Sequence, residues 1–389
     1  MKKKILFVID SLGCGGAEKS LVSLLPLLNK HKYEIHLWIL ARGGVLESLV
    51  PSDVVIENDP KYDKYEMISH KISKIFFSVY YRFQKRFGKN AYPSEVIWKC
   101  CGRTTKGLDE EYDVAIAYGQ GLSTYTTIDT IKAKKYIGWV NADMFATGYD
   151  IPFNLHFYDM MTYIVPVSEK LEKIMQINLP QYNNKYKCVY DILNPVLIQN
   201  MAKESVVDFS NGDKCLKLLT VARFVPPKGH ELVIQAALEL RQKAVKFVWI
   251  LVGDGICLPE IKKKVNDAGL QSSIVFVGMK SNPYPYMKWC DIYVQTSIHE
   301  GFGITISEAK ILNKPIVSTD FDTVYDQLEN EVNGLIVSKD GREIAEGIQR
   351  IINNKELRQK FVDKLKRDEN TKYLTEVVKV ERLLDEKNL

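Results

Sequence analysis

The chain has 389 residues, more than one ordinary hydrophobic core holds, so its length favours two domains. Its 46% hydrophobic and 26% charged residues and its modest net charge of +5 are typical of an ordinary folded protein and exclude extended disorder. The seven cysteines contain no C-x-x-C pair, and no window approaches the roughly 18 apolar residues that span a bilayer, so neither a zinc or disulfide framework nor a transmembrane helix is predicted.

The first half of the chain alternates short β-branched runs with helical patterns, as parallel sheets with crossover helices do. The apolar run after the first lysines is five residues long and ends at Asp10, so it is interpreted as a buried strand and not as a signal peptide. Residues 17–28 have a helical pattern. The predicted strands are 4–9, 34–40, 113–117, 136–140 and 163–167. Residues 1–195 are therefore predicted to be a doubly wound, Rossmann-like domain.

An insertion at 61–106 interrupts this pattern and is basic, with eleven Lys or Arg against three acidic residues. Its apolar residues recur at spacings of three and four, which predicts one helix with a continuous apolar stripe. The stripe consists of Ile68, Ile72, Ile75, Phe76, Val79, Tyr80, Phe83 and Phe87. Two interpretations stay open: a helix that lies in an anionic membrane interface, or a helix whose apolar stripe faces the core while its basic side faces solvent.

The second half repeats the alternation more clearly. Its predicted strands are 216–221, 247–252, 274–277, 292–295, 315–318 and 335–337. A polar stretch at 194–213 places the domain boundary, which gives a second Rossmann-like domain at 196–370 and a C-terminal helix at 371–389 that could pack back on the first domain. Two such sheets are expected to face each other across a cleft, because open α/β sheets bind ligands beyond the carboxyl ends of their strands.

Two cations, Arg223 and Lys228, follow the first strand of the second domain and precede a helix. A transferase that expels a nucleotide diphosphate must stabilise the charge that grows on the leaving phosphate. Fixed cations at a helix start can do this without a metal. The alternative is a pair of surface cations in a turn.

Two carboxylates, Glu300 and Glu308, are separated by glycines and a predicted helix start in the segment E-G-F-G-I-T-I-S-E. Glycine lets a ligand approach the backbone closely, and the free N–H groups of a helix start bind hydroxyls or phosphate. Carboxylates suit vicinal diols, so Glu300 could hold a sugar ring and Glu308 a ribose. Each glutamate alone could equally be a helix cap or a surface charge.

These motifs, taken in order along the chain, resemble those of retaining glycosyltransferases of family 4, also called glycosyltransferase group 1, of the bacterial surface-polysaccharide type. The resemblance spans about residues 4–370. In the second half it includes Gly253-Asp254-Gly255, Phe276-Val277-Gly278 and Asn282-Pro283-Tyr284-Pro285, besides the two motifs above. The first half agrees through Gly15-Gly16-Ala17-Glu18, Pro166-Val167-Ser168-Glu169 and Asn194-Pro195-Val196.

The resemblance implies the GT-B fold, an acceptor-binding first domain and a donor-binding second domain. It makes Arg223, Lys228 and Glu300 the catalytic residues, with the cations on the diphosphate and Glu300 on the sugar, while Glu308 binds the ribose. The other donor contacts that it implies are Gly15, Gly16, Gly253, Met279 with Lys280 near the base, Gly301, Phe302, Gly303 and Ile304. It implies neither a cofactor nor a metal, because the leaving phosphate can itself accept the acceptor's proton.

One position departs from the family pattern. In Trp139-Val140-Asn141-Ala142-Asp143 many relatives have histidine where this chain has Asn141, which can hydrogen-bond but cannot titrate near neutral pH. Asn141 and Asp143 are therefore candidates for the acceptor side. The alternative is an Asn-x-Asp turn that caps a strand.

Three further signals are set aside. Asp320-Phe321-Asp322 resembles a metal-binding D-x-D but follows a strand in a turn, so it is interpreted as structural. Gly13-Cys14-Gly15-Gly16 has Glu18 in place of the third glycine of the dinucleotide fingerprint, so no NAD is expected. The six histidines show no metal-ligand spacing, and His299 is expected to line the donor pocket.

The leading hypothesis is a cytoplasmic enzyme that transfers a hexose or N-acetylhexosamine from a nucleotide diphosphate sugar, with uridine as the expected base, to a glycan or polyprenyl-linked acceptor. The basic insertion suggests peripheral association with the inner face of an anionic membrane. No nucleic-acid partner is expected. The alternatives are a sugar-nucleotide epimerase of the same fold, for which no acid/base pair can be assigned, and a glycosyltransferase-like subunit without catalysis.

Overall fold

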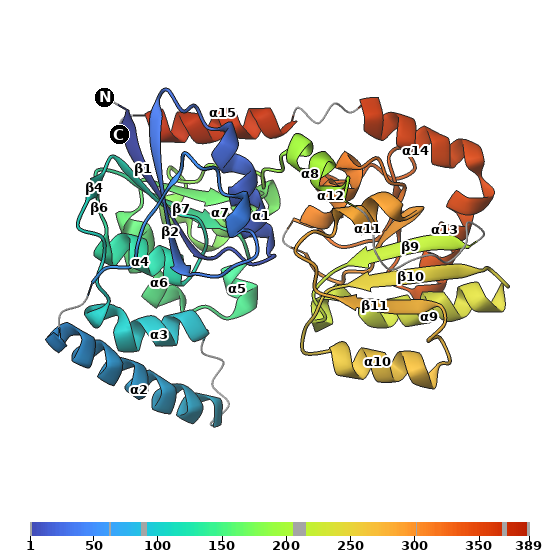
Figure 1. The fold of residues 1–389 in the computed structure, drawn as a ribbon, viewed down its shortest axis with the longest axis horizontal. Coiled ribbons are helices and arrows are strands. Elements are labelled where there is room, and N and C mark those ends of the chain that lie inside the picture. The colour runs from blue at the N-terminus through green and yellow to red at the C-terminus, as the bar shows by residue number, and fades with distance from the viewer. Residues whose placement is uncertain are drawn as a thin grey trace. The chain divides into compact units, whose positions relative to one another are not determined.

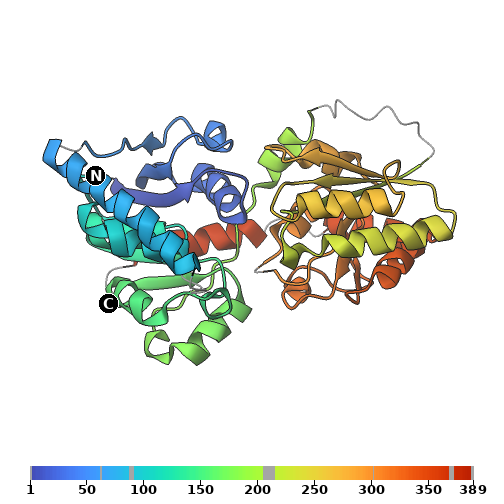
Figure 2. The same ribbon diagram turned by 90° about the horizontal axis from the view of Figure 1, so that it is seen from below.

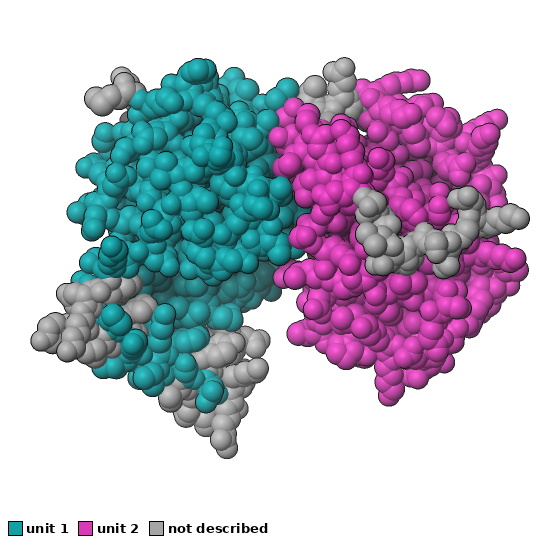
Figure 3. Space-filling model, viewed as in Figure 1, with its two compact units in different colours: residues 1–192, 374–389 teal, residues 193–373 magenta. Residues whose placement is uncertain are grey.

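A computed structural model describes residues 2–61, 64–86, 92–204, 215–300, 302–367 and 372–386. The chain forms two compact units, and Figure 3 shows them in two colours: residues 1–192 with 374–389, and residues 193–373. The prediction put these boundaries at 195/196 and 370/371. Each unit is built on one six-stranded parallel sheet of the same strand order, which is the doubly wound arrangement that the sequence predicts.

The sheet of the first unit has the order β3-β2-β1-β5-β7-β8 (Figure 1). Its strands are β1 (Lys3–Ser11), β2 (Tyr33–Ala41), β3 (Val55–Ile56), β5 (Val114–Ala117), β7 (Tyr136–Val140) and β8 (Tyr163–Pro166). Its crossover helices are α1 (Gly16–Leu24), α4 (Leu122–Thr130), α6 (Ile151–Met160) and α7 (Glu169–Asn178), with a short α5 (Met144–Thr147) and a small sheet of β4 (Glu111–Tyr112) and β6 (Lys132–Ala133). Helices cover both faces, so the central strands are continuous apolar runs.

The sheet of the second unit has the order β11-β10-β9-β12-β13-β14. Its strands are β9 (Leu216–Val221), β10 (Phe247–Val252), β11 (Ile274–Gly278), β12 (Ile292–Gln295), β13 (Ile316–Thr319) and β14 (Leu335–Val337). Its helices are α8 (Pro195–Met201), α9 (His230–Gln242), α10 (Leu258–Asp267), α11 (Tyr284–Trp289), α12 (Ile304–Ile311), α13 (Gly341–Asn353) and α14 (Lys355–Arg367). One buried cluster packs the sheet against α9, α10 and α13, and a second packs its other face against α11 and α12.

All eleven predicted strands form, with ends that differ by one or two residues. The helix predicted over 17–28 stops at Leu24 and continues as a 3₁₀ turn at Leu25–Leu27. Pro26 explains this end, because proline has no N–H for the helical hydrogen bond and its ring clashes with the preceding turn. The strand β3 was not predicted, since its two residues are too short to form a pattern.

The C-terminal helix α15 (Lys372–Asp385) belongs to the first unit from Leu374 onward. The buried Lys135 ammonium holds its end, donating to the carbonyl oxygens of Leu383 at 2.6 Å and Glu386 at 2.7 Å. A lysine there both satisfies terminal carbonyls and complements the negative end of the helix dipole. The chain thus returns to the first unit after completing the second.

The basic insertion forms α2 (Lys64–Arg86) and α3 (Pro93–Cys101). The two helices contact each other, and α2 lies outermost on the first unit (Figures 1 and 2). Among the described stripe residues, Ile72, Ile75 and Phe76 are each at least 60% exposed. The core-facing interpretation of this stripe is therefore wrong for these residues. Ile68, Val79, Phe83 and Phe87 fall outside the side chains that the structure describes. No helix in the described ranges is long and apolar enough to cross a bilayer.

Candidate active site

A lysine–glutamate ion pair joins the two motifs of the second unit. The Lys228 ammonium lies 2.6 Å from Glu300 Oε2, and the two side chains are 18% and 10% exposed. The sequence places these residues in separate strand-to-helix loops, after β9 and after β12. Their contact brings together the cation of the first motif and the first carboxylate of the second. Because the pair is largely withdrawn from water, each charge depends on the other.

Gly229 allows these two loops to meet. It has a φ of +63°, a conformation that favours glycine, and a Cβ there would lie 2.1 Å from the Thr296 carbonyl oxygen. A hydrogen bond also joins the two loops, because the Thr296 hydroxyl donates to the Lys228 carbonyl at 3.0 Å. The backbone that carries Lys228 is therefore fastened to the loop that leads to Glu300.

A buried polar network orients the Glu300 carboxylate. Gln295 Nε2 donates to Glu300 Oε1 at 2.8 Å, and the Ser297 hydroxyl donates to the same oxygen at 2.7 Å. Gln295 is in turn held by the hydroxyls of Tyr293, at 2.6 Å, and Thr305, at 3.1 Å. Thr305 belongs to the first turn of α12, so the network links Glu300 to the helix that carries Glu308.

Glu308 lies inside the unit, fully buried in α12. The Tyr284 hydroxyl donates to Glu308 Oε1 at 2.9 Å, which fixes the carboxylate toward α11. The helix begins at Ile304 after Gly303, whose φ of +81° is left-handed, and no side chain caps it. The start of α12 therefore has no side-chain cap among the described residues, and such a helix start can bind an anionic or hydroxylated ligand. Burial excludes the alternative of Glu308 as a surface charge.

His230 stands directly behind the lysine. It is buried, stacks on Phe224 with ring centroids 3.9 Å apart, and its two nitrogens have no hydrogen-bond partner among the described residues. Burial, followed by the repulsion of Lys228, lowers the pKa of His230 to about 4. The imidazole ring of His230 is therefore uncharged at neutral pH.

The remaining donor-side residues of the second unit lie at the carboxyl ends of neighbouring strands. Arg223 is exposed two residues beyond β9, and Gly253 follows β10 with a φ of +147°. Met279 is 61% exposed just after β11. Gln327 Nε2 donates to the Phe302 carbonyl at 3.2 Å, and Gly301 lies outside the described residues. No hydrogen bond or ion pair joins Arg223 to the Lys228–Glu300 pair among the described residues, so the structure does not bring this part of the predicted constellation together with the pair.

The predicted site residues of the first unit lie at the carboxyl end of its own sheet. Gly15 and Gly16 precede and begin α1, beyond the end of β1. Asp10, near the end of β1, accepts hydrogen bonds from both the backbone N–H, at 2.8 Å, and the hydroxyl of Ser123. This edge is thus built of glycine turns and short polar contacts.

Asn141 and Asp143 have different roles in the structure. Asp143 accepts from the N–H groups of Phe145, at 2.9 Å, and Ala146, at 3.2 Å, so it caps the helix α5, whereas the structural alternative was a turn that caps a strand. Both polar atoms of the Asn141 amide are buried without a hydrogen-bond partner in the described chain. An orphaned amide of this kind is rare in a folded protein and indicates a ligand or water position. Of the two candidates, Asn141 fits a ligand contact.

Sequence reasoning missed the supporting residues Gln295, Ser297, Tyr284 and His230. Gln295 carried a usable signal, since a polar residue ends the otherwise apolar strand Ile292–Gln295 where ligands bind. The other three act through tertiary contacts that no spacing in the sequence reveals.

Comparison with known proteins identifies the second unit. Residues 204–368 match the model of the family described as glycosyl transferases group 1. An uncharacterized glycosyltransferase of Methanocaldococcus jannaschii is 26% identical over 170 residues, which is 43% of this chain and 42% of that protein. This chain therefore aligns with less than half of that relative.

Two relatives are similar over nearly the whole chain. N-acetylgalactosamine-N,N'-diacetylbacillosaminyl-diphospho-undecaprenol 4-alpha-N-acetylgalactosaminyltransferase of Campylobacter jejuni is 23% identical over 378 residues, covering 94% of each chain. The crystal structure of HepE from Anabaena in complex with UDP and glucose superposes with a TM-score of 0.72 at 18% identity, covering 99% of this chain and 100% of that one. The structural likeness shows that the fold is GT-B.

Proposed function

We propose that this chain, whose residues 204–368 form a glycosyl transferases group 1 domain within a GT-B fold, transfers a hexose or N-acetylhexosamine from a UDP-sugar with retention of configuration. The observation that carries the proposal is the withdrawn Lys228–Glu300 ion pair at the carboxyl edge of the second sheet. It places a cation and a hydrogen-bond acceptor for sugar hydroxyls side by side, at the position where parallel sheets bind ligands.

The donor would exchange partners with this pair. Its diphosphate would draw the Lys228 ammonium away from Glu300, because phosphate oxygens offer the lysine a denser negative charge. Glu300 would then accept hydrogen bonds from the sugar hydroxyls, while Gln295 and Ser297 keep its other oxygen in place. Since charge grows on the leaving diphosphate during bond cleavage, Lys228 would bind the transition state more tightly than the bound donor.

Glu308 and the start of α12 would complete the donor site. The buried Glu308 carboxylate, held by Tyr284, would accept from the ribose hydroxyls, and the uncapped N–H groups of α12 would bind the donor's polar atoms. Arg223, exposed beside the pair, would swing onto the diphosphate. The two cations would thereby balance the negative charge of the leaving diphosphate without a metal ion. The leaving phosphate oxygen would take the acceptor's proton.

The first unit would bind the acceptor. The name of the Campylobacter relative describes a diphospho-undecaprenol-linked substrate, and we infer a glycan or polyprenyl-linked acceptor for this chain as well. The exposed apolar stripe of α2, with Phe76 stacked on Tyr80 and Lys71, Lys74 and Arg82 exposed beside it, fits a protein that rests on an anionic membrane. This supports a location at the cytoplasmic face of the membrane.

The donor half of this proposal can be tested without knowing the acceptor. The purified chain is incubated with UDP-, GDP- and ADP-linked hexoses and N-acetylhexosamines, and the released nucleotide is measured. We expect slow hydrolysis of at least one UDP-sugar, which Glu300→Gln reduces by about 30-fold because a charge-assisted hydrogen bond is lost. The proposal is contradicted if no donor is turned over and none is bound.

A further inference from the structure

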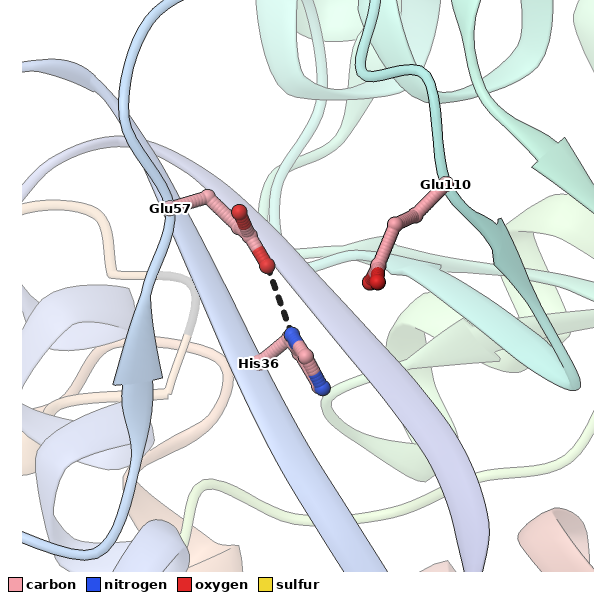
Figure 4. A group of neighbouring side chains, drawn as sticks. All are labelled: His36, Glu57 and Glu110. Carbon is pink, nitrogen blue, oxygen red and sulfur yellow. Dashed lines mark hydrogen bonds and ion pairs between the residues drawn. The ribbon is translucent and has the colours of Figure 1, made fainter.

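Three side chains from separate segments of the first unit meet outside the candidate active site. His36 lies in β2, Glu57 follows β3, and Glu110 precedes β4 (Figure 4). One ligand atom from each lies within 4.8 Å of those from the other two. His36 is the fourth residue of β2, in the half of the strand away from the carboxyl edge, so this cluster is separate from the residues at the sheet's ligand-binding end.

The His36 imidazole has a carboxylate at each nitrogen. Nδ1 lies 2.6 Å from Glu57 Oε1, and Nε2 lies 3.1 Å from Glu34 Oε1. A cation between the ring and a carboxylate would contact a ring nitrogen and a carboxylate oxygen, which are ligand types that zinc takes.

The charges around the ring favour a cation. Among the described residues, the ion pairs of the carboxylates of Glu34, Glu57 and Glu110 involve His36 and the Lys4 ammonium, which lies 3.0 Å from Glu110 Oε1. Acidic side chains therefore form a surplus over basic ones in these pairs, which a divalent cation would reduce. His36 is only 5% exposed, so water screens this surplus poorly at the ring.

The outer contacts of the cluster resemble those of built metal sites. The Tyr112 hydroxyl donates to Glu57 Oε1 at 3.1 Å and orients that carboxylate. With Nδ1 as the ligand, the Nε2–H donates to Glu34, which fixes the tautomer and raises the basicity of the ligating nitrogen. Tyr112 and Glu34 thus orient the proposed metal ligands without binding the ion themselves.

We propose that His36 Nδ1, Glu57 and Glu110 bind one divalent transition-metal ion, of which Zn²⁺ is the reference case. Zinc takes nitrogen and carboxylate ligands at about 2.0 to 2.2 Å, with water in a remaining position. Glu110 is the most exposed of the three, with 52% of its side chain accessible, and it has a second oxygen for the ion while Lys4 keeps the first. The bound ion would fasten the short edge strand β3 and the segment before β4 to β2.

This site could not be predicted from the sequence, because the three ligands lie in separate segments of the chain and form no motif with a fixed spacing. Parallel pairing is what unites them: His36 pairs with Val55 and Leu6, and Glu57 follows β3 in the same register. The site is independent of the proposed transferase activity and can be tested whatever that activity proves to be.

The experiment uses the full chain, stripped with a chelator and dialysed. Co²⁺ is titrated while the visible absorption is recorded, and Zn²⁺ is added while the melting temperature is measured. We expect saturation at one equivalent of Co²⁺ with the intense bands of a site of low coordination number. At a hundredfold excess of Zn²⁺ over its Kd, the melting temperature of the first unit should rise by about 5 °C or more.

Glu110→Gln and His36→Gln test the ligands. Glu110 is exposed enough for its variant to fold, and Glu110→Gln should weaken Co²⁺ binding at least tenfold, while His36→Gln should abolish the saturable bands. His31→Gln, at an exposed histidine just before β2, is the matched control and should bind as the parent chain does. The proposal is overturned if the parent chain shows no saturable binding, or if Glu110→Gln and His36→Gln bind as tightly as His31→Gln. Either result would mean that His36 only forms hydrogen bonds with the carboxylates around it.

Discussion

The two units repeat one sheet topology but differ in the groups that they present at its carboxyl edge. The second unit presents a partly buried ion pair, Lys228 with Glu300, backed by the network around Gln295. The first unit presents glycine turns, the Asp10–Ser123 contact and the orphaned amide of Asn141. The same fold thus offers a lysine–glutamate ion pair in one unit and a carboxylate–hydroxyl contact with an unpartnered amide in the described part of the other, and function follows the loops and not the sheet.

This difference suits the two partners of a glycosyl transfer. A nucleotide diphosphate needs cations whose effect increases as it leaves, whereas an acceptor hydroxyl needs orientation more than charge. The comparison fits the proposal that the second unit binds the donor and the first unit the acceptor. Four groups of variants test the roles given to the two units.

The largest effect is expected at Lys228. Lys228→Ala should lower donor hydrolysis by about 2 to 4 kcal/mol in transition-state free energy, about 30- to 1,000-fold in rate, because the cation contacts charge that develops during cleavage. Steady-state nucleotide release measures it. Lys263→Ala, at an exposed lysine of α10, is the matched control and should remain within about twofold of the parent. Equal rates for the two variants would remove the cation from the site.

The next effect concerns acid stability, where two groups with shifted pKa values have opposite signs. The folded state lowers the pKa of His230 from 6.5 to about 4, so the unfolded state binds more protons between these values and stability is lost as the pH falls. Burial raises the pKa of Asp191 in the first unit to about 6, so its contribution is lost as the pH rises instead.

Urea unfolding should show the His230 contribution directly. Between about pH 7 and about pH 5 we expect it to reduce the free energy of unfolding of the second unit by about 2 kcal/mol. His230→Phe keeps the stacking on Phe224 and should abolish this part of the pH dependence, whereas Asp191→Asn should change only the first unit. An unchanged slope in His230→Phe would show that His230 is not the buried neutral ring described above.

A smaller and selective effect is expected at Asn141. Its amide makes no hydrogen bond in the described chain, so Asn141→Ala should cost about 1 kcal/mol or less in stability, yet slow transfer to an acceptor by about 10- to 30-fold. Donor hydrolysis should stay intact. Asn154→Ala is the contrasting control: this buried amide donates to Glu95 at 2.7 Å and accepts from Tyr125 at 3.0 Å, so its loss should destabilise by about 2 to 3 kcal/mol. Equal destabilisation by both variants would make Asn141 structural.

The smallest effect is expected on α2. Phe76→Ser should weaken binding to vesicles of phosphatidylcholine with phosphatidylglycerol by about tenfold, since one aromatic side chain leaves the interface. Ile177→Ser, at an even more exposed apolar residue of α7, should bind as the parent does. Co-sedimentation at two salt concentrations measures both. Binding that Phe76→Ser leaves unchanged would separate the first unit from the membrane.

The sequence predicts the strands of both six-stranded sheets except β3, because each of the others is a short apolar run between turn residues, as at Phe247–Val252. It also predicts Lys228, Glu300 and Glu308 through their motif, and it leaves Asp143 undecided, which the structure resolves as a cap of α5. It could not predict the Gln295 network or the His36 cluster, because these depend on which strands become neighbours. The exposure of the α2 stripe was likewise undecidable, since periodicity shows a face and not what covers it.

The proposed function requires that Lys228 exchange Glu300 for the donor diphosphate, and a crystal structure with a bound UDP-sugar tests this exchange directly. We expect the Lys228 ammonium to leave its 2.6 Å contact with Glu300 Oε2 for a diphosphate oxygen, while Glu300 turns to the sugar hydroxyls. A donor bound elsewhere, with the Lys228–Glu300 pair still closed, would contradict it.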